Sequence, residues 1–357
     1  MDPAYFGRAR HGRRSATAIE FTSAPHSRRI GATPPALGSR MQQQSFESYV
    51  RHGQTPFFRL PVVDEGRAGR ERYLGCDAAL IGVPYDAGTT YRSGARLAPY
   101  HVRRVSALVP GYHPTHRLDV FQTLAAVDCG NVMAPPFNAG AMRELVHAEV
   151  AAVLEAGSTP FVIGGDHSVS LPVLRALAER HGPVALVHID AHFDCSAAEN
   201  WGENFHHGTP VRNAVEEGLI APEQLFQIGL RGPWGGESDA AMPEAFGAMH
   251  VLADELGTTG AATVAKRIVE RVGDRPVYLS IDIDAVDPAY APGTGTPVPG
   301  GMTSRELLGL LRGLAGVKVC GCDVVEVTPM LDHADVTCLL AAYALYEGVA
   351  LAAISRV

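Results

Sequence analysis

Short apolar segments alternate with longer amphipathic segments along the chain from about residue 75 onward. The short segments are rich in β-branched residues and end in Gly, Pro or Asp, as buried strands commonly do. Because they are apolar on both faces and are separated by helical patterns, they indicate a parallel sheet that is covered on both sides. The alternation therefore predicts an α/β fold, a three-layer α/β/α domain with a central, mostly parallel sheet of about eight strands.

The predicted elements can be placed by residue number. Strands are expected at 78–84, 124–128, 160–164, 184–190, 225–230, 250–252, 277–283 and 317–324. Helices are expected at 141–156, 169–180, 261–272, 304–314 and 335–354. No internal repeat stands out, so residues 41–357 are interpreted as a single domain.

Composition narrows the class of protein. The 357 residues are 46% apolar, which is ample for one large core. The net charge of −8 and the lack of a basic stripe argue against nucleic acid as a partner. No run reaches about 18 uninterrupted apolar residues, which argues against a membrane span. The six scattered cysteines are interpreted as reduced thiols of a cytoplasmic protein.

The first 40 residues differ in composition from the rest. They contain seven Arg, no Lys and two acids, so they carry +5, against −13 for residues 41–357. This composition is compatible with a transit peptide, with a disordered tail, or with a region upstream of a translation start at Met41. We interpret residues 1–40 as a disordered N-terminal extension.

Three polar clusters follow predicted strands directly. They are GGDHS at 164–168, DAHFD at 190–194 and DID at 282–284. Each alone has a structural explanation, as a turn or a strand-end salt bridge. Ligands and catalytic groups collect at the carboxyl ends of parallel strands, so three clusters at such ends indicate one functional site.

The acidic side chains of these clusters can converge, because alternate residues of an extended chain point the same way. Asp190, His192 and Asp194 share one side, as do Asp282 and Asp284. Four carboxylates repel one another unless cations lie among them, and two divalent ions bridged by carboxylates would neutralise them. Mixed His and Asp ligands favour Mn, Ni, Zn or Co over Ca or Mg.

These segments resemble the signatures of the ureohydrolase family, which includes arginase and agmatinase. Further similar segments are GVPYD at 82–86, RSGAR at 92–96, HGTP at 207–210, IGLRG at 228–232, SIDIDAVDP at 280–288, APGTGTPVPGG at 291–301 and VEV at 325–327. The resemblance extends from about Ile81 to the C-terminus and implies an arginase-like fold with a single catalytic domain. The stretch CSAAENWGENFH at 195–206 and the HGT turn, where arginase has HGQ, look most like the agmatinase-like branch.

The resemblance implies two divalent metal ions per subunit, with manganese expected and nickel as the alternative. One ion would be bound by His167, Asp190, Asp194 and Asp282. The other would be bound by Asp190, His192, Asp282 and Asp284, so that Asp190 and Asp282 bridge. His207 matches the family's catalytic histidine, and Glu326 matches the carboxylate that binds the guanidinium group.

The implied reaction is the hydrolysis of agmatine, or a related guanidino acid or amine, to urea and an amine. A guanidinium is a poor electrophile, and a two-metal centre supplies the hydroxide needed at neutral pH. Glu326 could pair bidentately with the planar cation, and His207 could protonate the departing amine.

The residues that would contact the far end of the substrate are less clearly defined. Glu199 and Glu203 could attract an ammonium group, and Trp201 could add a cation–π contact, although both acids could equally be solvated loop residues. For guanidinobutyrate, with its distal carboxylate, Arg212 or Arg231 could serve, although Arg231 is more typical of a residue that braces a loop. Phe193 and Cys195 depart from the family's usual residues without altering the ligands.

Several alternatives stay open at this point. Within the family they are hydrolysis of guanidine or guanidinobutyrate, or of formiminoglutamate. The non-enzymatic alternative is an inactive subunit kept for assembly, which the complete set of six ligands argues against. The resemblance also implies a homo-oligomer, a trimer or a hexamer, while charge and composition argue against nucleic acid or a membrane as partner.

Overall fold

The computed structural model describes residues 55–356, apart from residue 65 and residues 235–237. The predicted extension at 1–40 and a start at Met41 lie outside these described residues. The domain boundary therefore stays a prediction.

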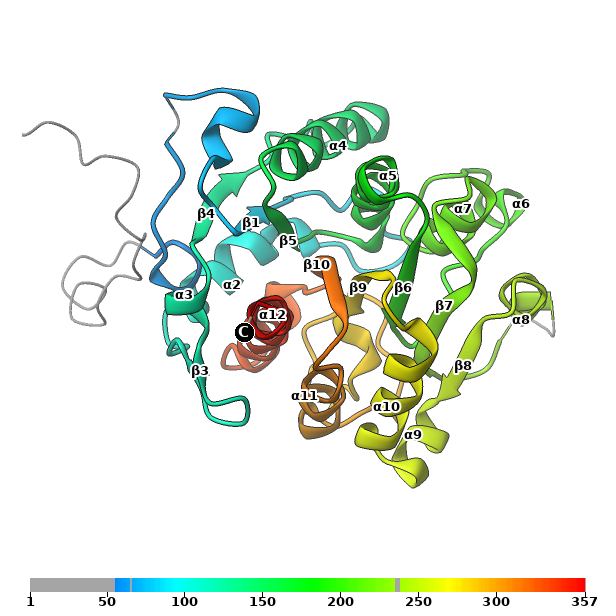
Figure 1. The fold of residues 1–357 in the computed structure, drawn as a ribbon. Coiled ribbons are helices and arrows are strands. Elements are labelled where there is room, and N and C mark those ends of the chain that lie inside the picture. The colour runs from blue at the N-terminus through cyan, green and yellow to red at the C-terminus, as the bar shows by residue number, and fades with distance from the viewer. Residues whose placement is uncertain (1–54, 65, 235–237, 357) are drawn as a thin grey trace, which may run out of the picture. The chain divides into compact units, whose positions relative to one another are not determined.

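Within the described residues, eight strands form one sheet in the order β4-β1-β5-β10-β9-β6-β7-β8 (Figure 1). Every neighbouring pair is parallel. The strands are β1 (Ala78–Gly82), β4 (Ala126–Asn131), β5 (Thr159–Ile163), β6 (Val184–Ile189), β7 (Ile220–Leu230), β8 (Met249–Leu252), β9 (Pro276–Asp282) and β10 (Lys318–Val325). The predicted fold class and all eight predicted strands are confirmed.

Helices cover both faces of the sheet (Figure 1). One layer contains α4 (Ala139–Glu155), α5 (Ser170–His181) and α7 (Pro210–Glu216), and its apolar side chains form one core cluster with the sheet. The other contains α2 (Ala98–Ser106), α10 (Ala261–Val272), α11 (Ser304–Gly313) and α12 (Val336–Ile354), which form a second core cluster on the opposite face.

Shorter elements complete the described part of the chain. The helices are α3 (Val120–Thr123), α6 (Ala198–Trp201), α8 (Ser238–Ala245) and α9 (Ala253–Thr259), and a small hairpin pairs β2 (Tyr112–His113) with β3 (Leu118–Asp119). Six single 3-10 turns are η1 (Phe57–Arg59), η2 (Gly69–Tyr73), η3 (Ala95–Leu97), η4 (His167–Val169), η5 (Ile283–Ala285) and η6 (Pro329–Leu331).

The most apolar helix is α12. By length and composition alone it could cross a membrane, and 83% of its most apolar 18-residue window is buried inside the structure. It contacts β10 and β5 of the sheet as well as α2 and α11. Core packing therefore accounts for its apolar residues.

Candidate metal centre

The three polar clusters lie at the carboxyl ends of central strands. β5 leads into residues 164–168, β6 into 190–194, and β9 into η5. Only β10 and β9 separate β5 from β6, so these strand ends meet at one edge of the sheet. Gly165 allows the first cluster to approach the segment after β1 closely, because a Cβ there would lie 1.5 Å from the Tyr85 carbonyl oxygen. The same oxygen accepts a hydrogen bond from the backbone N–H of Asp166, which fixes the loop.

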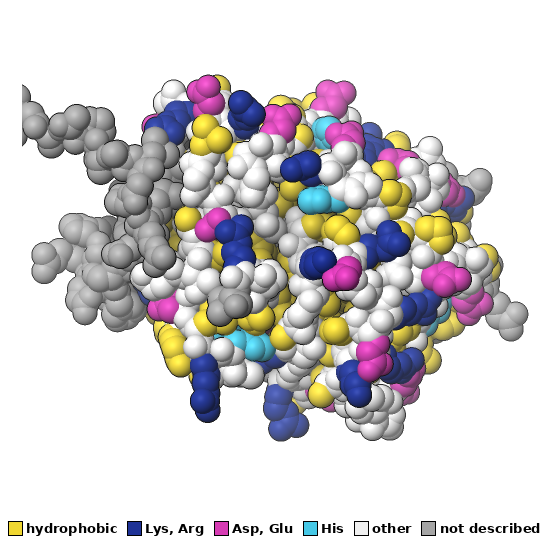
Figure 2. Space-filling view, viewed as in Figure 1, with side chains coloured by type: hydrophobic (Ala, Val, Ile, Leu, Met, Phe, Trp, Pro, Cys, Tyr) yellow, Lys and Arg dark blue, Asp and Glu magenta, His cyan; other side chains and the backbone are white. Residues whose placement is uncertain are grey.

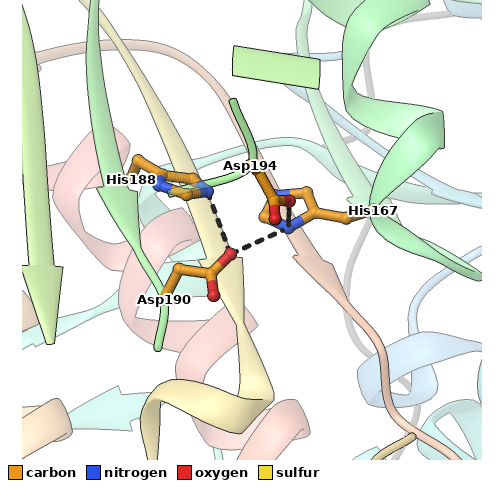
Figure 3. Close-up of side chains that lie close together, drawn as sticks. All are labelled: His167, His188, Asp190 and Asp194. Atoms are coloured by element: carbon orange, nitrogen blue, oxygen red, sulfur yellow. Dashed lines mark ion pairs between the residues drawn. The ribbon is translucent and has the colours of Figure 1, made fainter. Parts of the chain in front are cut away.

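His167 is the centre of a first group of ligand atoms. Its Nδ1 lies 3.1 Å from Asp190 Oδ2, 3.0 Å from Asp194 Oδ2 and 3.2 Å from Asp282 Oδ2. Figure 3 shows His167, Asp190 and Asp194 pointing toward one another. Nδ1 is buried and makes no hydrogen bond of good geometry with the described residues. Atoms that share a small divalent ion at about 2.0–2.2 Å lie about 3 Å apart, so this spacing fits a shared metal.

His192 is the centre of a second group. Its Nδ1 lies 3.3 Å from Asp190 Oδ1 and 3.1 Å from Asp284 Oδ2. Asp190 thus presents one oxygen to each group, as a bridging carboxylate would. Asp282 presents Oδ2 to His167, whereas its Oδ1 accepts a hydrogen bond from the Asp284 backbone N–H at 2.8 Å. A bridging role for Asp282 therefore stays a prediction.

The four aspartates are crowded together in the interior, and none is more than 9% exposed. Burial, together with the charges of Asp284 and Asp190, raises the pKa of Asp282 well above its ordinary value. Burial likewise raises the pKa of Asp284. The cluster needs positive charge to be fully ionised, and two divalent cations would supply it. The donor set and the spacing of its atoms support a binuclear centre.

A chain of hydrogen bonds behind His167 determines which of its ring nitrogens is free. Nε2 lies 2.8 Å from Ser280 Oγ, and the Ser280 hydroxyl donates to Asp323 Oδ1 at 2.8 Å. Asp323 also accepts hydrogen bonds from the hydroxyls of Tyr278 and Ser170. Because the Ser280 proton points to the carboxylate, Ser280 Oγ accepts from Nε2–H. With a metal bound, Nδ1 would then offer its lone pair on the side of the three aspartates, as a metal ligand must.

His188 is a polar residue of the site that the sequence interpretation missed. Its Nε2 lies 3.0 Å from Asp190 Oδ2, without good hydrogen-bond geometry (Figure 3). The Gln227 amide nitrogen donates to the Phe193 carbonyl at 2.8 Å and lies 3.3 Å from His188 Nδ1. Nδ1 therefore accepts, and His188 presents an N–H to Asp190 rather than a lone pair to a metal. The sequence does give one sign of this role, because His188 is a polar residue inside the otherwise apolar strand β6.

His207 and Glu326 form a buried pair beside the first group. His207 Nδ1 lies 3.0 Å from Glu326 Oε1, and His207 Nε2 lies 2.7 Å from Thr90 Oγ1. Burial lowers the pKa of His207, but the hydrogen bond and charge of Glu326, helped by nearby aspartates, outweigh burial and raise that pKa to about 9. The raised pKa favours a proton on His207, carried by Nδ1 toward Glu326, while Nε2 accepts a hydrogen bond from the Thr90 backbone N–H at 3.2 Å.

Glu326 keeps one oxygen available. Oε1 accepts from the His167 backbone N–H at 2.8 Å, whereas Oε2 is buried and makes no hydrogen bond within the described residues. The backbone of Glu326 is left-handed, with a φ of 61°, and that of Asp194 is similar, with a φ of 53°. Strained non-glycine conformations of this kind are retained where a side chain must be aimed at a site.

A cavity of about 720 Å³ adjoins the centre, and its lining includes His192, Asp194, Asp282 and His207. Of the three predicted distal contacts, Trp201 lines this cavity and is 64% exposed. Glu203 is not among the lining residues, and its carboxylate accepts from the Phe205 backbone N–H. The side chain of Glu199 lies outside the described part of the structure.

Arg231 also lines the cavity, but its guanidinium is engaged. It donates to the carbonyl oxygens of Val298, Ala285 and Asp284 at 2.6–3.0 Å. These bonds tie Val298 to the turn after β9. The expectation that Arg231 braces a loop is confirmed.

Comparison with known proteins places this geometry in a family. Residues 76–350 match the model of the Arginase family. Proclavaminate amidinohydrolase of Streptomyces clavuligerus is 43% identical over 301 residues, which cover 84% of this chain and 94% of that protein. Mitochondrial agmatinase of Gallus gallus is 39% identical over 322 residues, which cover 88% and 91%.

The fold agrees with this relationship. The solved structure of proclavaminate amidinohydrolase superposes with a TM-score of 0.79 at 41% identity, over 85% of this chain and 98% of that one. The family match at residues 76–350 covers every strand that carries a proposed ligand or catalytic candidate. The chain therefore belongs to the arginase family, and it is a hydrolase that acts on C–N bonds of linear amidines.

Proposed function

We propose that this protein hydrolyses agmatine, or a related guanidino acid or amine, to urea and an amine. The observation that carries the proposal is the position of Asp190, whose two oxygens face the His167 group and the His192 group separately. Six residues from three strand ends would thus surround two adjacent metal positions.

Two divalent cations, when bound, would supply the Lewis acidity that activates water at neutral pH. His167, Asp190, Asp194 and Asp282 would hold one of them, and Asp190, His192, Asp282 and Asp284 the other. We propose Mn²⁺, with Ni²⁺ as the alternative, because the set mixes imidazole and carboxylate ligands.

Glu326 and His207 are the proposed catalytic residues around the substrate. Glu326 Oε2, buried without a hydrogen bond, can accept N–H groups of a planar guanidinium and hold its carbon in place. His207 can hold a proton on Nδ1 toward Glu326, and we propose that it passes a proton to the departing amine. Trp201 lies at the cavity and is a candidate contact for the distal end, as Glu199 and Glu203 were on sequence grounds.

The experiment is a panel of agmatine, guanidinobutyrate, guanidinopropionate, arginine and guanidine, each tested with Mn²⁺ and with Ni²⁺, with urea as the readout. Release of urea and an amine from one or more guanidino compounds is expected. No urea from any compound by protein carrying two metals per chain would overturn the proposal and leave an inactive subunit. Glutamate formed from formiminoglutamate without urea would instead indicate formiminoglutamate hydrolase.

We also propose a cytoplasmic homo-oligomer, a trimer or a hexamer, without nucleic acid or membrane partners. Acidic and basic side chains are interspersed over the face shown in Figure 2, and α12 is buried rather than exposed. Light scattering on purified protein tests the assembly. A mass of one chain would contradict it.

A further inference from the structure

The inference concerns the outer part of the 720 Å³ cavity and rests on the proposed function. We infer that this part favours, among the guanidino substrates of the proposed function, those whose distal end carries an aromatic or other bulky apolar group. The preferred substrate is then an arylalkyl-type guanidine whose ring leans on Trp234 and Trp201.

Both tryptophans of the chain line this cavity, although each is substantially exposed. Trp201 is 64% exposed and Trp234 is 42% exposed. Tryptophan is mostly buried in folded proteins, and exposed aromatic rings that gather around a cavity commonly contact a ligand. Their position is therefore better explained by binding than by packing.

One aromatic residue of the cavity, Phe193, lies next to the proposed metal ligands, and we call Phe193, Trp234 and Trp201 the aromatic wall. Phe193 lies between His192 and Asp194 in the chain and lines the cavity. The Trp234 ring meets the Phe193 ring edge-on, with centroids 4.8 Å apart and planes at 68°. Phe193 is supported from His250 by a second edge-on contact at 5.4 Å. The Phe193–Trp234 contact thus links the segment that carries the proposed ligands to an exposed ring of the cavity.

The charged side chains around the outer cavity are already paired. Arg212 donates through Nε to Glu216 at 2.8 Å, and Arg231 is bonded to backbone carbonyls. Asp239 is engaged as well. Each of these charged groups thus has a partner within the protein, and the two tryptophan rings are the largest exposed apolar side chains among the described lining residues.

The size of the cavity points the same way. A cavity of about 720 Å³ is within the range of roughly 300–1,000 Å³ that accommodates drug-sized ligands. Agmatine and guanidinobutyrate are slender chains that would leave much of the aromatic wall in contact with water. A ring at the end of the chain would cover it.

The first test compares kcat/KM for four guanidines with the same four-carbon chain: agmatine, 4-guanidinobutyrate, butylguanidine and 4-phenylbutylguanidine. The phenyl compound should exceed butylguanidine by about tenfold, mainly through KM. Trp234→Ala should reduce this ratio to near one. Phe137→Ala, which removes an aromatic ring that is 88% exposed and is not among the lining residues, should leave the ratio unchanged. Equal kcat/KM for the phenyl and butyl compounds in the parent enzyme would overturn the inference but not the proposed function.

The second test does not depend on turnover. Since the chain has two tryptophans and both line the cavity, its intrinsic fluorescence reports on this site directly. Titration with 4-phenylbutylguanidine should change the emission of Trp201→Phe and of Trp234→Phe, each of which retains one reporter, and at lower concentrations than butylguanidine does. Saturable binding of the phenyl compound without urea release would refute the proposed function while supporting the inference. Absence of any emission change would refute the inference even if urea is released.

Discussion

At the scale of single residues, the site depends on which atom of each side chain is turned toward the centre. The two oxygens of Asp190 face the His167 group and the His192 group. In Glu326, Oε1 contacts His167 and His207, whereas Oε2 makes no hydrogen bond within the described residues. The Nδ1 of His167 is left for a metal because its Nε2–H is bound by Ser280. The residues that orient these ligand atoms can therefore be tested by substitution, as the ligands themselves can.

Asp323→Asn should weaken metal binding at the His167 position by about 10–100-fold, because the Ser280 proton would no longer be held away from His167. Competition with a metal chelator measures this affinity, and thermal unfolding of the metal-free protein checks the fold. Ser170→Ala is the matched control, since it removes a different hydrogen bond to Asp323 and leaves the Ser280–His167 bond intact. Equal losses in both variants would contradict the tautomer argument.

His207 should titrate with a pKa of about 9 in the metal-free protein, as followed by the NMR signals of its ring. Since the folded-state pKa is raised, the stabilisation from its pairing with Glu326 is complete below the ordinary histidine pKa and is lost as pH rises through about 9. Glu326→Gln should move the titration down toward neutral pH. An unchanged pKa in that variant would show that Glu326 is not the cause.

Asp282→Asn should abolish urea release and weaken binding of both metals if Asp282 bridges. Metal content per chain, measured after dialysis, decides the matter. Loss of one metal with retention of the other would refute the bridging role. The hydrogen bond that Asp282 Oδ1 accepts from the Asp284 backbone N–H is the reason to test it.

The sequence predicted the residues that form motifs and missed those that support them. His167 or Asp284 stands at a strand end, where a polar residue calls for an explanation. His188 and Asp323 stand inside strands, at positions buried on both faces, and their partners Gln227 and Ser280 come from other strands. Such supporting pairs depend on the order of strands in the sheet, which a single chain does not display.

At the scale of elements, the strands were located well because each is apolar on both faces and ends in a turn residue. The observed strand boundaries differ from the predicted ones where the backbone hydrogen bonds extend beyond the apolar segment. β7 begins at Ile220 rather than at residue 225, because the ladder to β6 starts there and then shifts register. Short basic helices such as α2 lack a long apolar face and were not singled out. α10 coincides with its predicted range at both ends.

The start of α12 offers a test at this scale. The carboxylate of Asp332 accepts hydrogen bonds from the backbone N–H groups of Thr337 and Cys338. Burial tends to raise its pKa, but these hydrogen bonds outweigh burial and lower it. Asp332→Ala should therefore cost about 1 kcal/mol of stability at neutral pH, or a few degrees in Tm.

The same interaction predicts a pH dependence. A lowered folded-state pKa stabilises the protein above the ordinary pKa of aspartate, and this stabilisation is lost as pH falls through the lowered value. The difference in unfolding free energy between parent and Asp332→Ala should thus shrink toward acid pH. Glu144→Gln, on the exposed side of α4, is the control and should show no such difference.

At the scale of the whole molecule, the buried carboxylates make folding and metal binding interdependent. Four aspartates at one sheet edge disfavour the metal-free fold, and a ligand that binds only the folded state stabilises it by an amount that grows with its concentration. Millimolar Mn²⁺ or Ni²⁺ should raise Tm, and a chelator should lower it, as calorimetry would show. A Tm insensitive to both would indicate that the centre does not bind these metals.

The position of β10 between β5 and β9 has a consequence for how the molecule is assembled. It is the last of the described strands in sequence, yet it fills a central place in the sheet and leads directly into Glu326. Residues 164–326 must therefore all be in place before the reaction centre exists, and the contacts that complete it span a long stretch of chain. Long-range strand pairing of this kind is slow. During refolding, we expect the ability to retain metal to appear with the final cooperative phase rather than with early collapse.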